Sequence, residues 1–345
     1  MRKFSLSVLL FSLILFSTIG CEPKSDNNDS LALLLLGAVA SANSASENLA
    51  CQNKTLSWTI RTPASADSWQ SVKFANDRFV AIATSAAVGA MVSSDGITWT
   101  GHATSQPSQS LTSLAYGNGK FVATSPSNTV SIISSPDGVT WTDRTTNPTP
   151  FMPGGVSFGN GVFVALASGG GDKVWTSTDG LIWTGRTVPD PSAAWTPVGF
   201  GNGLFVALRG STGKVMTSPD GINWTARNDV EVNGWSSITY GNGLFVAVAN
   251  SGTNNRVMTS PDGITWTPRS PAAGNQWNSV TYGNGLFVAV SSDGTNQIMT
   301  STDGITWKAQ SAPEQITWKS ITFGKNTFVA VSFSGPSKVM TASCE

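Results

Sequence analysis

The sequence has little of the side-chain chemistry that most enzymes need. It holds one histidine, His102, so neither a histidine-based metal site nor a Ser-His-Asp triad can be assembled from it. Tyrosine and cysteine occur only three times each, and no glycine-rich phosphate loop precedes a helix. We therefore expect no catalytic residue, no metal and no cofactor.

Charge is also scarce, and neither sign dominates. Charged residues make up 12% of the chain, and 20 basic residues balance 20 acidic ones. Proteins that bind nucleic acid need clustered positive charge to neutralise phosphates, so we expect no nucleic-acid partner. The 35 glycines, with abundant Ser, Thr and Asn, are typical of a turn-rich, all-β exported protein.

The amino-terminal segment predicts export and a lipid anchor. Arg2 and Lys3 precede an apolar run over residues 4–19, which is too short for a comfortable membrane span. The run ends in Thr18-Ile19-Gly20-Cys21, which resembles the lipobox of bacterial lipoproteins. The resemblance implies cleavage before Cys21 and acylation of that residue, so that buried acyl chains bind the protein to a membrane. The alternative is an ordinary secretory signal with an incidental cysteine.

These features divide the amino-terminal part into two predicted segments. Residues 1–20 are interpreted as a lipoprotein signal peptide, and residues 21–50 as a lipid-anchored tether rich in Ser, Asn, Asp and Ala. Within the tether, residues 31–42 are apolar, but a helix of that length covers only about 18 Å of a hydrocarbon core roughly 30 Å thick. The expected location is the bacterial cell envelope, on the outer membrane or the cell surface.

The rest of the chain is an internal repeat marked by tryptophan. Seven of these residues recur every 41 or 42 positions: Trp58, Trp99, Trp141, Trp183, Trp224, Trp266 and Trp307. Six of them end the phrase Ser-x-Asp-Gly-x-x-Trp, whose acidic residues are Asp95, Asp137, Asp179, Asp220, Asp262 and Asp303. Self-similarity at such a period is the signature of a repeat architecture.

Each period contains four strand-like segments with turn signals between them. In one unit the expected strands are residues 235–240, 244–249, 256–260 and 264–268. Asn242-Gly243 favours a type I′ hairpin, because both central residues of that turn need positive φ. Pro261-Asp262-Gly263 supplies the next turn. Four-stranded antiparallel units of about this length, repeated in a ring, are propeller blades.

The repeat predicts an all-β, seven-bladed β-propeller of four-stranded antiparallel blades over residues 51–345. The seventh unit, residues 318–344, contains three strands and lacks its fourth, while residues 55–61 form a lone strand at the other end. We therefore expect this N-terminal strand to complete the last blade and close the ring, which leaves no unpaired sheet edge.

The cysteines agree with this closure. With Cys21 assigned to lipid, Cys51 and Cys344 remain, and each flanks one half of the shared blade. Exported proteins can keep disulfides, so a Cys51–Cys344 bridge is predicted. Two free thiols are the alternative.

At the Ser-x-Asp-Gly-x-x-Trp phrases the sequence resembles Asp-box (BNR-repeat) propellers, with one residue fewer than usual between Asp and Trp. That superfamily includes sialidases, some secreted glycosidases and photosystem II assembly-factor propellers. The resemblance implies that each box is a structural turn remote from the active face. Its carboxylate then accepts turn amides, and its Trp packs between blades. One box per blade is too dispersed for calcium, which takes roughly six to eight oxygen ligands.

The resemblance does not carry the sialidase mechanism with it, because the tyrosines do not fit the role of its Tyr nucleophile. Tyr116, Tyr240 and Tyr282 share one slot before a Gly-Asn-Gly turn. The other blades fill that slot with Phe74, Phe158, Phe200 and Phe323. A tyrosine that phenylalanine can replace is interpreted as packing.

Two sets of side chains mark the face that should carry the crossovers between blades. Five tryptophans open first strands: Trp69, Trp195, Trp235, Trp277 and Trp318. Five arginines follow a repeat Trp by three residues: Arg61, Arg144, Arg186, Arg227 and Arg269. Indole faces stack on sugars and arginine forks bind carboxylate or sulfate, although both sets could simply cover blade junctions.

These observations favour a non-catalytic binding or adhesion module, expected to be a monomer, for a glycan or protein ligand on the crossover face. A glycoside hydrolase and an envelope assembly scaffold are the alternatives.

Overall fold

The computed structural model describes residues 51, 55–84, 88–105, 110–126, 132–144, 151–170, 174–190, 194–210, 212–252, 255–333 and 338–344. The predicted signal peptide, the tether and Cys21 lie outside these residues, so they stay predictions. Regular structure in the described ranges is entirely β, and no helix there could cross a bilayer.

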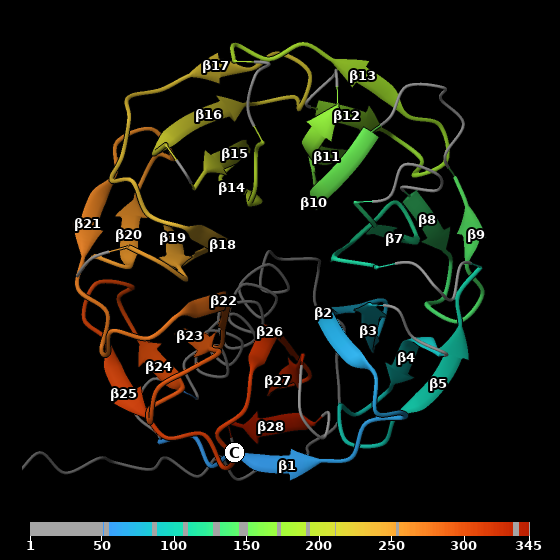
Figure 1. Cartoon of the computed structure of the whole chain (residues 1–345), viewed down its shortest axis with the longest axis vertical. Helices are drawn as coiled ribbons and strands as arrows, with labels where there is room; N and C mark the ends of the chain where they lie inside the picture. Colours follow the sequence, from blue (N-terminus) through green and yellow to red (C-terminus); the bar gives the residue numbers. More distant parts are fainter. Residues whose placement is uncertain are drawn as a thin grey trace, which may run out of the picture. The chain divides into compact units, whose positions relative to one another are not determined.

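Seven four-stranded antiparallel sheets are arranged around a central axis as blades (Figure 1). Blade 1 consists of β2 (Ser68–Ala75), β3 (Arg78–Thr84), β4 (Gly89–Ser93) and β5 (Thr100–Ala103). Blade 2 consists of β6 (Ser113–Gly117), β7 (Lys120–Thr124), β8 (Ile132–Ser135) and β9 (Thr142–Asp143). Blade 3 consists of β10 (Phe151–Gly159), β11 (Val162–Gly170), β12 (Val174–Ser177) and β13 (Thr184–Arg186).

Blade 4 consists of β14 (Val198–Gly201), β15 (Leu204–Arg209), β16 (Lys214–Ser218) and β17 (Thr225–Ala226). Blade 5 consists of β18 (Trp235–Gly241), β19 (Leu244–Ala249), β20 (Val257–Ser260) and β21 (Thr267–Arg269). Blade 6 consists of β22 (Trp277–Gly283), β23 (Leu286–Ser291), β24 (Ile298–Ser301) and β25 (Lys308–Gln310). The predicted seven-bladed propeller is therefore confirmed.

Blade 7 joins the two ends of the repeat. It consists of β26 (Trp318–Gly324), β27 (Thr327–Ser332), β28 (Val339–Ser343) and β1 (Thr59–Arg61). Strand β1 pairs antiparallel with β28, with Thr59 opposite Thr341 and Arg61 opposite Val339 (Figure 1). The N-terminal strand thus completes the last blade, as the truncated seventh unit predicted.

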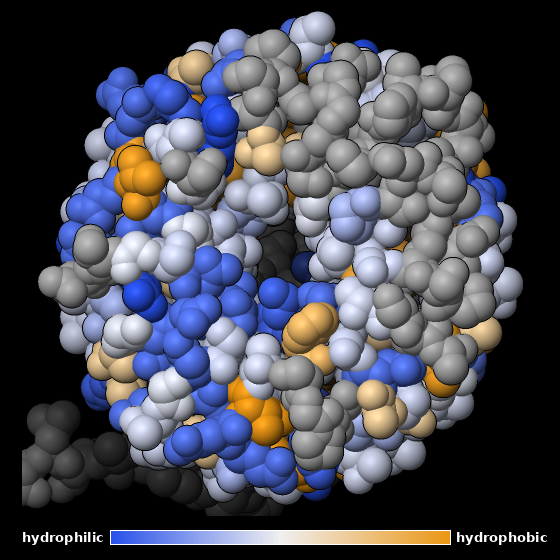
Figure 2. All heavy atoms as spheres, viewed as in Figure 1, coloured by the Kyte–Doolittle hydropathy of each residue, from blue (hydrophilic) through white to orange (hydrophobic). Residues whose placement is uncertain are grey.

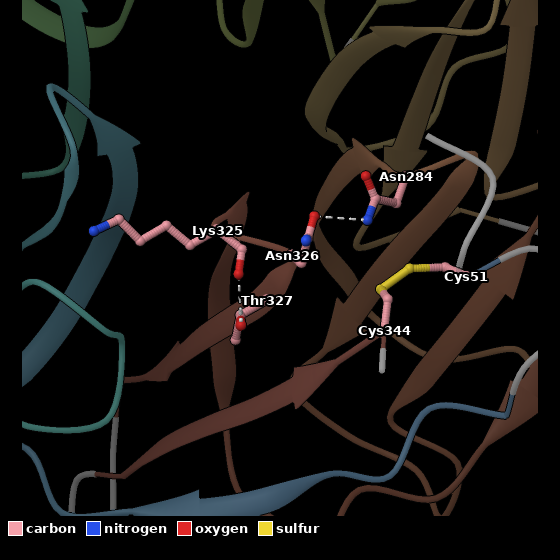
Figure 3. The surroundings of a disulfide bond; sticks show 6 residues. All are labelled: Cys51, Asn284, Lys325, Asn326, Thr327 and Cys344. Atoms are coloured by element: carbon pink, nitrogen blue, oxygen red, sulfur yellow. Dashed lines mark hydrogen bonds between the residues drawn. A yellow bond between two sulfur atoms is a disulfide. The ribbon is translucent and has the colours of Figure 1, made fainter. Parts of the chain in front are cut away.

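Three further contacts secure this closure. A disulfide joins Cys51 to Cys344, whose Cα atoms lie 5.0 Å apart across a sequence separation of 293 (Figure 3). Trp58 Nε1 donates to Gln310 Oε1 at 3.2 Å, and Gln310 Nε2 donates to the Leu56 carbonyl. These bonds attach the residues before β1 to the outermost strand of blade 6.

The core lies between neighbouring blades, where apolar side chains of two adjacent sheets form shared clusters. In every blade the Tyr or Phe of the first strand meets a Phe of the second strand with ring centroids 4.6–4.7 Å apart. In six blades a glycine ends the first strand and faces the same aromatic slot of the next blade: a Cβ on Gly241 would overlap the Tyr282 ring, and one on Gly324 would overlap Phe74. The tyrosine slot is therefore a packing position, as the exchange with Phe indicated.

The Gly-Asn-Gly turns also link neighbouring blades. Asn118 and Asn160 have φ of 44° and 46°, which fits the type I′ geometry that the sequence predicted. The Asn118 side chain donates to the carbonyls of Gly161 and Thr178 in blade 3, at 3.1 and 2.6 Å. One residue thus sets the turn and contacts the next blade.

Removal of the disulfide tests the closure. The double variant Cys51→Ser/Cys344→Ser should lose up to roughly 5 kcal/mol of stability, because the bridge closes almost the whole domain into one loop in the unfolded chain. Thermal unfolding of oxidised wild type, reduced wild type and the variant measures this loss. Mass mapping without reductant should find the 51–344 crosslink, and two alkylatable thiols in the folded protein would contradict it.

Candidate functional site

The six boxes are closed structural turns. In blade 5, Asp262 Oδ1 accepts the backbone N–H groups of Ile264 and Thr265, both at 2.8 Å, and the Ser260 hydroxyl at 2.9 Å. Ser260 Oγ accepts the Gly263 N–H at 2.8 Å, and Trp266 Nε1 donates to the Gly263 carbonyl at 3.2 Å. The same serine–aspartate–amide pattern recurs at Asp95, Asp137, Asp179, Asp220 and Asp303.

These hydrogen bonds hold the box carboxylates in the ionised form. The N–H of Thr265 lowers the pKa of Asp262 below its ordinary value of 3.8, and burial opposes that shift. At Asp220, burial pushes the pKa upward, but hydrogen bonds from Asn223, Ile222 and Ser218 outweigh it, so the pKa is lowered. The carboxylates are thus committed to the turns rather than poised for acid–base chemistry.

The boxes should make stability depend on acid pH. A carboxyl whose pKa is lower in the folded state stabilises the protein above its unfolded pKa, and this contribution is lost as pH falls through the folded pKa. Between about pH 4 and pH 2, the melting temperature of wild type should therefore fall more steeply than that of Asp220→Asn/Asp262→Asn. A thermal-melt series against pH measures the two slopes, and parallel curves would refute the role of these carboxylates.

The five first-strand tryptophans are buried and offer no face to a ligand. Trp69, Trp277 and Trp318 are 0% exposed, and Trp195 and Trp235 are 2% and 4% exposed. Each indole N–H donates to a backbone carbonyl of the preceding crossover: Ser65, Asp190, Glu231, Ala273 and Glu314, at 3.1–3.4 Å. The five tryptophans expected on the binding face are thus part of the core, because each lies at or just before the start of an innermost strand and packs between neighbouring blades.

The five arginines lie at the outer edge of the blades. Arg61, Arg144, Arg186, Arg227 and Arg269 each donate Nε–H to a hydroxyl of the neighbouring third strand, at 2.8–3.0 Å. The acceptors are Thr341, Ser134, Thr176, Thr217 and Thr259. The structure therefore does not bring the arginines and tryptophans together at one site, since each of the five arginines joins the outermost strand of its blade to the third strand of the same blade.

Replacing a buried tryptophan by alanine tests whether its indole packs in the core or binds a ligand. Because both side chains are buried, Trp235→Ala and Trp277→Ala should each destabilise the domain by about 3–5 kcal/mol. Thermal unfolding of each variant, beside the milder Trp→Phe exchange at the same positions, measures this. Melting temperatures close to wild type would restore a surface role for the two indoles.

A cavity lies on the axis of the ring, where the sequence pattern predicted no site. The beginnings of the innermost strands surround a cavity of about 460 Å³, and Figure 2 shows the ring hollowed at its centre. Its lining is mostly hydroxyl, amide and backbone groups, including Gln70, Thr112, Gly154, Thr196 and Asn278. No carboxylate and no aromatic side chain lines it within the described part of the chain.

A set of serines builds the wall of this axial cavity. Ser113, Ser237, Ser279 and Ser320 each accept a backbone N–H from the first strand of the next blade, at 3.1–3.2 Å. A hydroxyl that accepts one hydrogen bond still has a donor and a second lone pair. The serines thus hold adjacent inner strands together and retain capacity for a ligand. Seen singly in the sequence, these residues looked like ordinary strand serines.

Two lysines give the axis positive charge. Lys319 lines the axial cavity. Lys73 lies two residues beyond Ser71 on β2, so its side chain shares the face of that strand that Ser71 presents to the cavity. Lys73 is exposed to solvent and Lys319 is half-buried, and partial desolvation by the neighbouring strands lowers the pKa of both Lys73 and Lys319.

Other hollows are less suited to a ligand. A groove of about 590 Å³ lies between blade 6 and the residues before β1, but its polar lining includes Asp303 and Gln310, which the box turn and the ring closure already use. A pocket of about 210 Å³ beside Trp235 and Glu231 is smaller. In the described ranges, no three His, Cys, Asp or Glu side chains are grouped as a metal site would require.

Comparison with known proteins supports the fold and leaves the role open. A family model described as the DUF6242 beta propeller domain matches residues 228–344, which contain strands β18 to β28. No curated protein matches the chain.

Several solved structures are similar in fold, and three illustrate the range. YCF48 bound to D1 peptide has a TM-score of 0.65 at 13% identity, covering 83% of this chain and 96% of that one. A catalytically inactive His-to-Ala virginiamycin B lyase from Staphylococcus aureus with quinupristin has a TM-score of 0.74 at 14% identity, covering 84% and 99%. The WD40 beta propeller domain of Doa1 has a TM-score of 0.61 at 13% identity, covering 84% and 98%. At these identities the likeness concerns architecture only.

Proposed function

We propose that this protein is a non-catalytic binding propeller that accepts a segment of a partner protein in its axial cavity. The observation that carries the proposal is the lining of that cavity, in which serine and threonine hydroxyls, side-chain amides and backbone groups converge from the described innermost strands. Such groups pair with the amides and carbonyls of an extended peptide, and a few placed polar groups suffice to orient a ligand.

The same lining favours a peptide over a glycan. Sugar-binding sites use aromatic faces for stacking, and the tryptophans that were candidates for this role are buried. The described wall of the axial cavity has no aromatic side chain. A propeller of similar architecture has been solved with a D1 peptide, which supports a protein ligand by analogy of fold.

Binding is also favoured over catalysis by specific placements. The similar virginiamycin B lyase is inactivated by loss of a histidine, whereas His102, the sole histidine here, lies on β5, the outermost strand of blade 1. Glycoside hydrolysis ordinarily needs two carboxylates across a scissile bond, and the described lining of the axial cavity supplies none.

The amino-terminal signals suggest where the partner is found. We propose that acylation of Cys21 attaches the propeller to a membrane of the bacterial cell envelope and that residues 21–50 act as a tether. In that setting the protein is an adhesion, capture or assembly module for an envelope or extracellular protein, and the folded domain acts as a monomer.

A plugged cavity tests the proposal. Selection of a random peptide display library on the wild-type domain should enrich binders, and Gln70→Trp should weaken their binding roughly tenfold or more by filling the axial cavity. Lys308→Trp is the matched control, because Lys308 is exposed on the outermost strand β25. Enriched peptides that bind wild type and Gln70→Trp equally, or no enrichment at all, would overturn peptide binding at the axis.

A further inference from the structure

The two axial lysines occupy adjacent strands at different depths. Lys319 belongs to β26 of blade 7 and Lys73 to β2 of blade 1. The N–H of Val72 donates to Ser320 Oγ at 3.1 Å, and the N–H of Phe74 donates to Thr322 Oγ1 at 3.2 Å. The two strands therefore run side by side in the same direction. Lys73 therefore lies beside Ile321, which is two residues beyond Lys319. At roughly 3.3 Å per residue, Lys73 is about 7 Å farther along the strand direction than Lys319.

Both lysines depart from the repeat. At the Lys319 position the other blades carry neutral residues: Gln70, Thr112, Gly154, Thr196, Ser236 and Asn278. At the Lys73 position they also carry neutral residues: Ala115, Ser157, Gly199, Thr239, Thr281 and Thr322. The blade architecture thus needs no cation at either place, and the two exceptions are neighbours across the ring closure.

Neither lysine has a compensating acid in the described ranges. The ion pairs found there join Arg209 to Asp190, Lys214 to Asp229 and Lys325 to Asp77. Partial desolvation lowers the pKa of both ammonium groups, so a positive charge at either position is unfavourable without an anion beside it. Groups that break a local rule without a structural gain are expected at functional sites.

We propose that Lys319 and Lys73 together bind a carboxylate of the peptide that enters the axial cavity. This deepens the proposed function and rests on it, because it names the ligand as an acidic peptide segment. Each ammonium offers three donors, and the hydroxyls of Ser71 and Ser320 lie on the same two strands. An acidic sugar also carries a carboxylate, but the described wall of the axial cavity has no aromatic side chain on which a sugar could stack.

A titration of the lysine side chains tests the site directly. Reductive ¹³C-methylation keeps the positive charge and gives each lysine an NMR signal, which Lys73→Met, Lys319→Met and Lys308→Met assign. Glutarate and the peptide acetyl-Ser-Glu-Ser-amide should shift the Lys73 and Lys319 signals saturably and leave Lys308 unmoved. Each axial Met variant should weaken binding roughly tenfold or more, whereas Lys308→Met should not.

Two readouts distinguish ligand binding from a structural role. The ligand should raise the pKa of Lys73 and Lys319 toward the ordinary value, because an anion stabilises the ammonium form. Lys73→Met and Lys319→Met should keep or raise the melting temperature, since each removes an uncompensated charge. A lowered melting temperature in both variants, with unchanged glutarate affinity, would mean that the lysines are structural and would refute the proposal.

The remaining outcomes separate the two proposals. One outcome is that display peptides lose binding in Gln70→Trp yet show no preference for acidic residues and no dependence on Lys73 or Lys319. That result would refute the carboxylate site and leave the proposal of peptide binding intact. Glutarate binding without any peptide binding would keep the anion site but refute its peptide ligand. Tighter binding of glucuronate than of the glutamate peptide would assign the site to acidic sugars and overturn the proposal.

Discussion

The structure depends on the interface between successive blades. A four-stranded sheet of this size has two apolar faces and can bury them only against its neighbours, so each aromatic cluster joins two blades. Gly241 shows how close the approach is, since any side chain there would occupy the space of the Tyr282 ring. Because each blade relies on the next, the array is complete only when blade 7 meets blade 1. Pairing of β1 with β28 and the Cys51–Cys344 bridge secure that junction.

Regular polar contacts reinforce the same interface. Box aspartates fix the turns that carry the box tryptophans, asparagines of the Gly-Asn-Gly turns reach carbonyls of the next blade, and axial serines accept amides from the next inner strand. Most of the recurring sequence features thus stabilise the fold. The arginines and first-strand tryptophans belong to this group as well, which is why they do not form the binding surface that their positions suggested.

Function is better sought where the repeat is broken. A feature that every blade shares is explained by the needs of every blade, whereas Lys73 and Lys319 each occur once and carry an unfavourable charge at the axis. The axial cavity they serve is a product of ring closure, since its lining residues come from strands far apart in the sequence. An axial site also lets one ligand contact several blades at once, so a small number of substitutions can set its specificity.

The sequence by itself determined the architecture, because periodicity and turn chemistry are local. The 41- or 42-residue spacing of Trp58 to Trp307 gives the blade number, Asn-Gly pairs give the hairpins, and the missing last strand gives the closure with its cysteines. Only the tertiary structure decided which side of each strand faces solvent. The position of Trp235 at the start of a strand does not reveal that this residue is only 4% exposed and packs between two blades. Nor does an isolated serine or lysine reveal that it meets its counterparts at the axis, since that cavity exists only after seven separate sheets have closed into a ring.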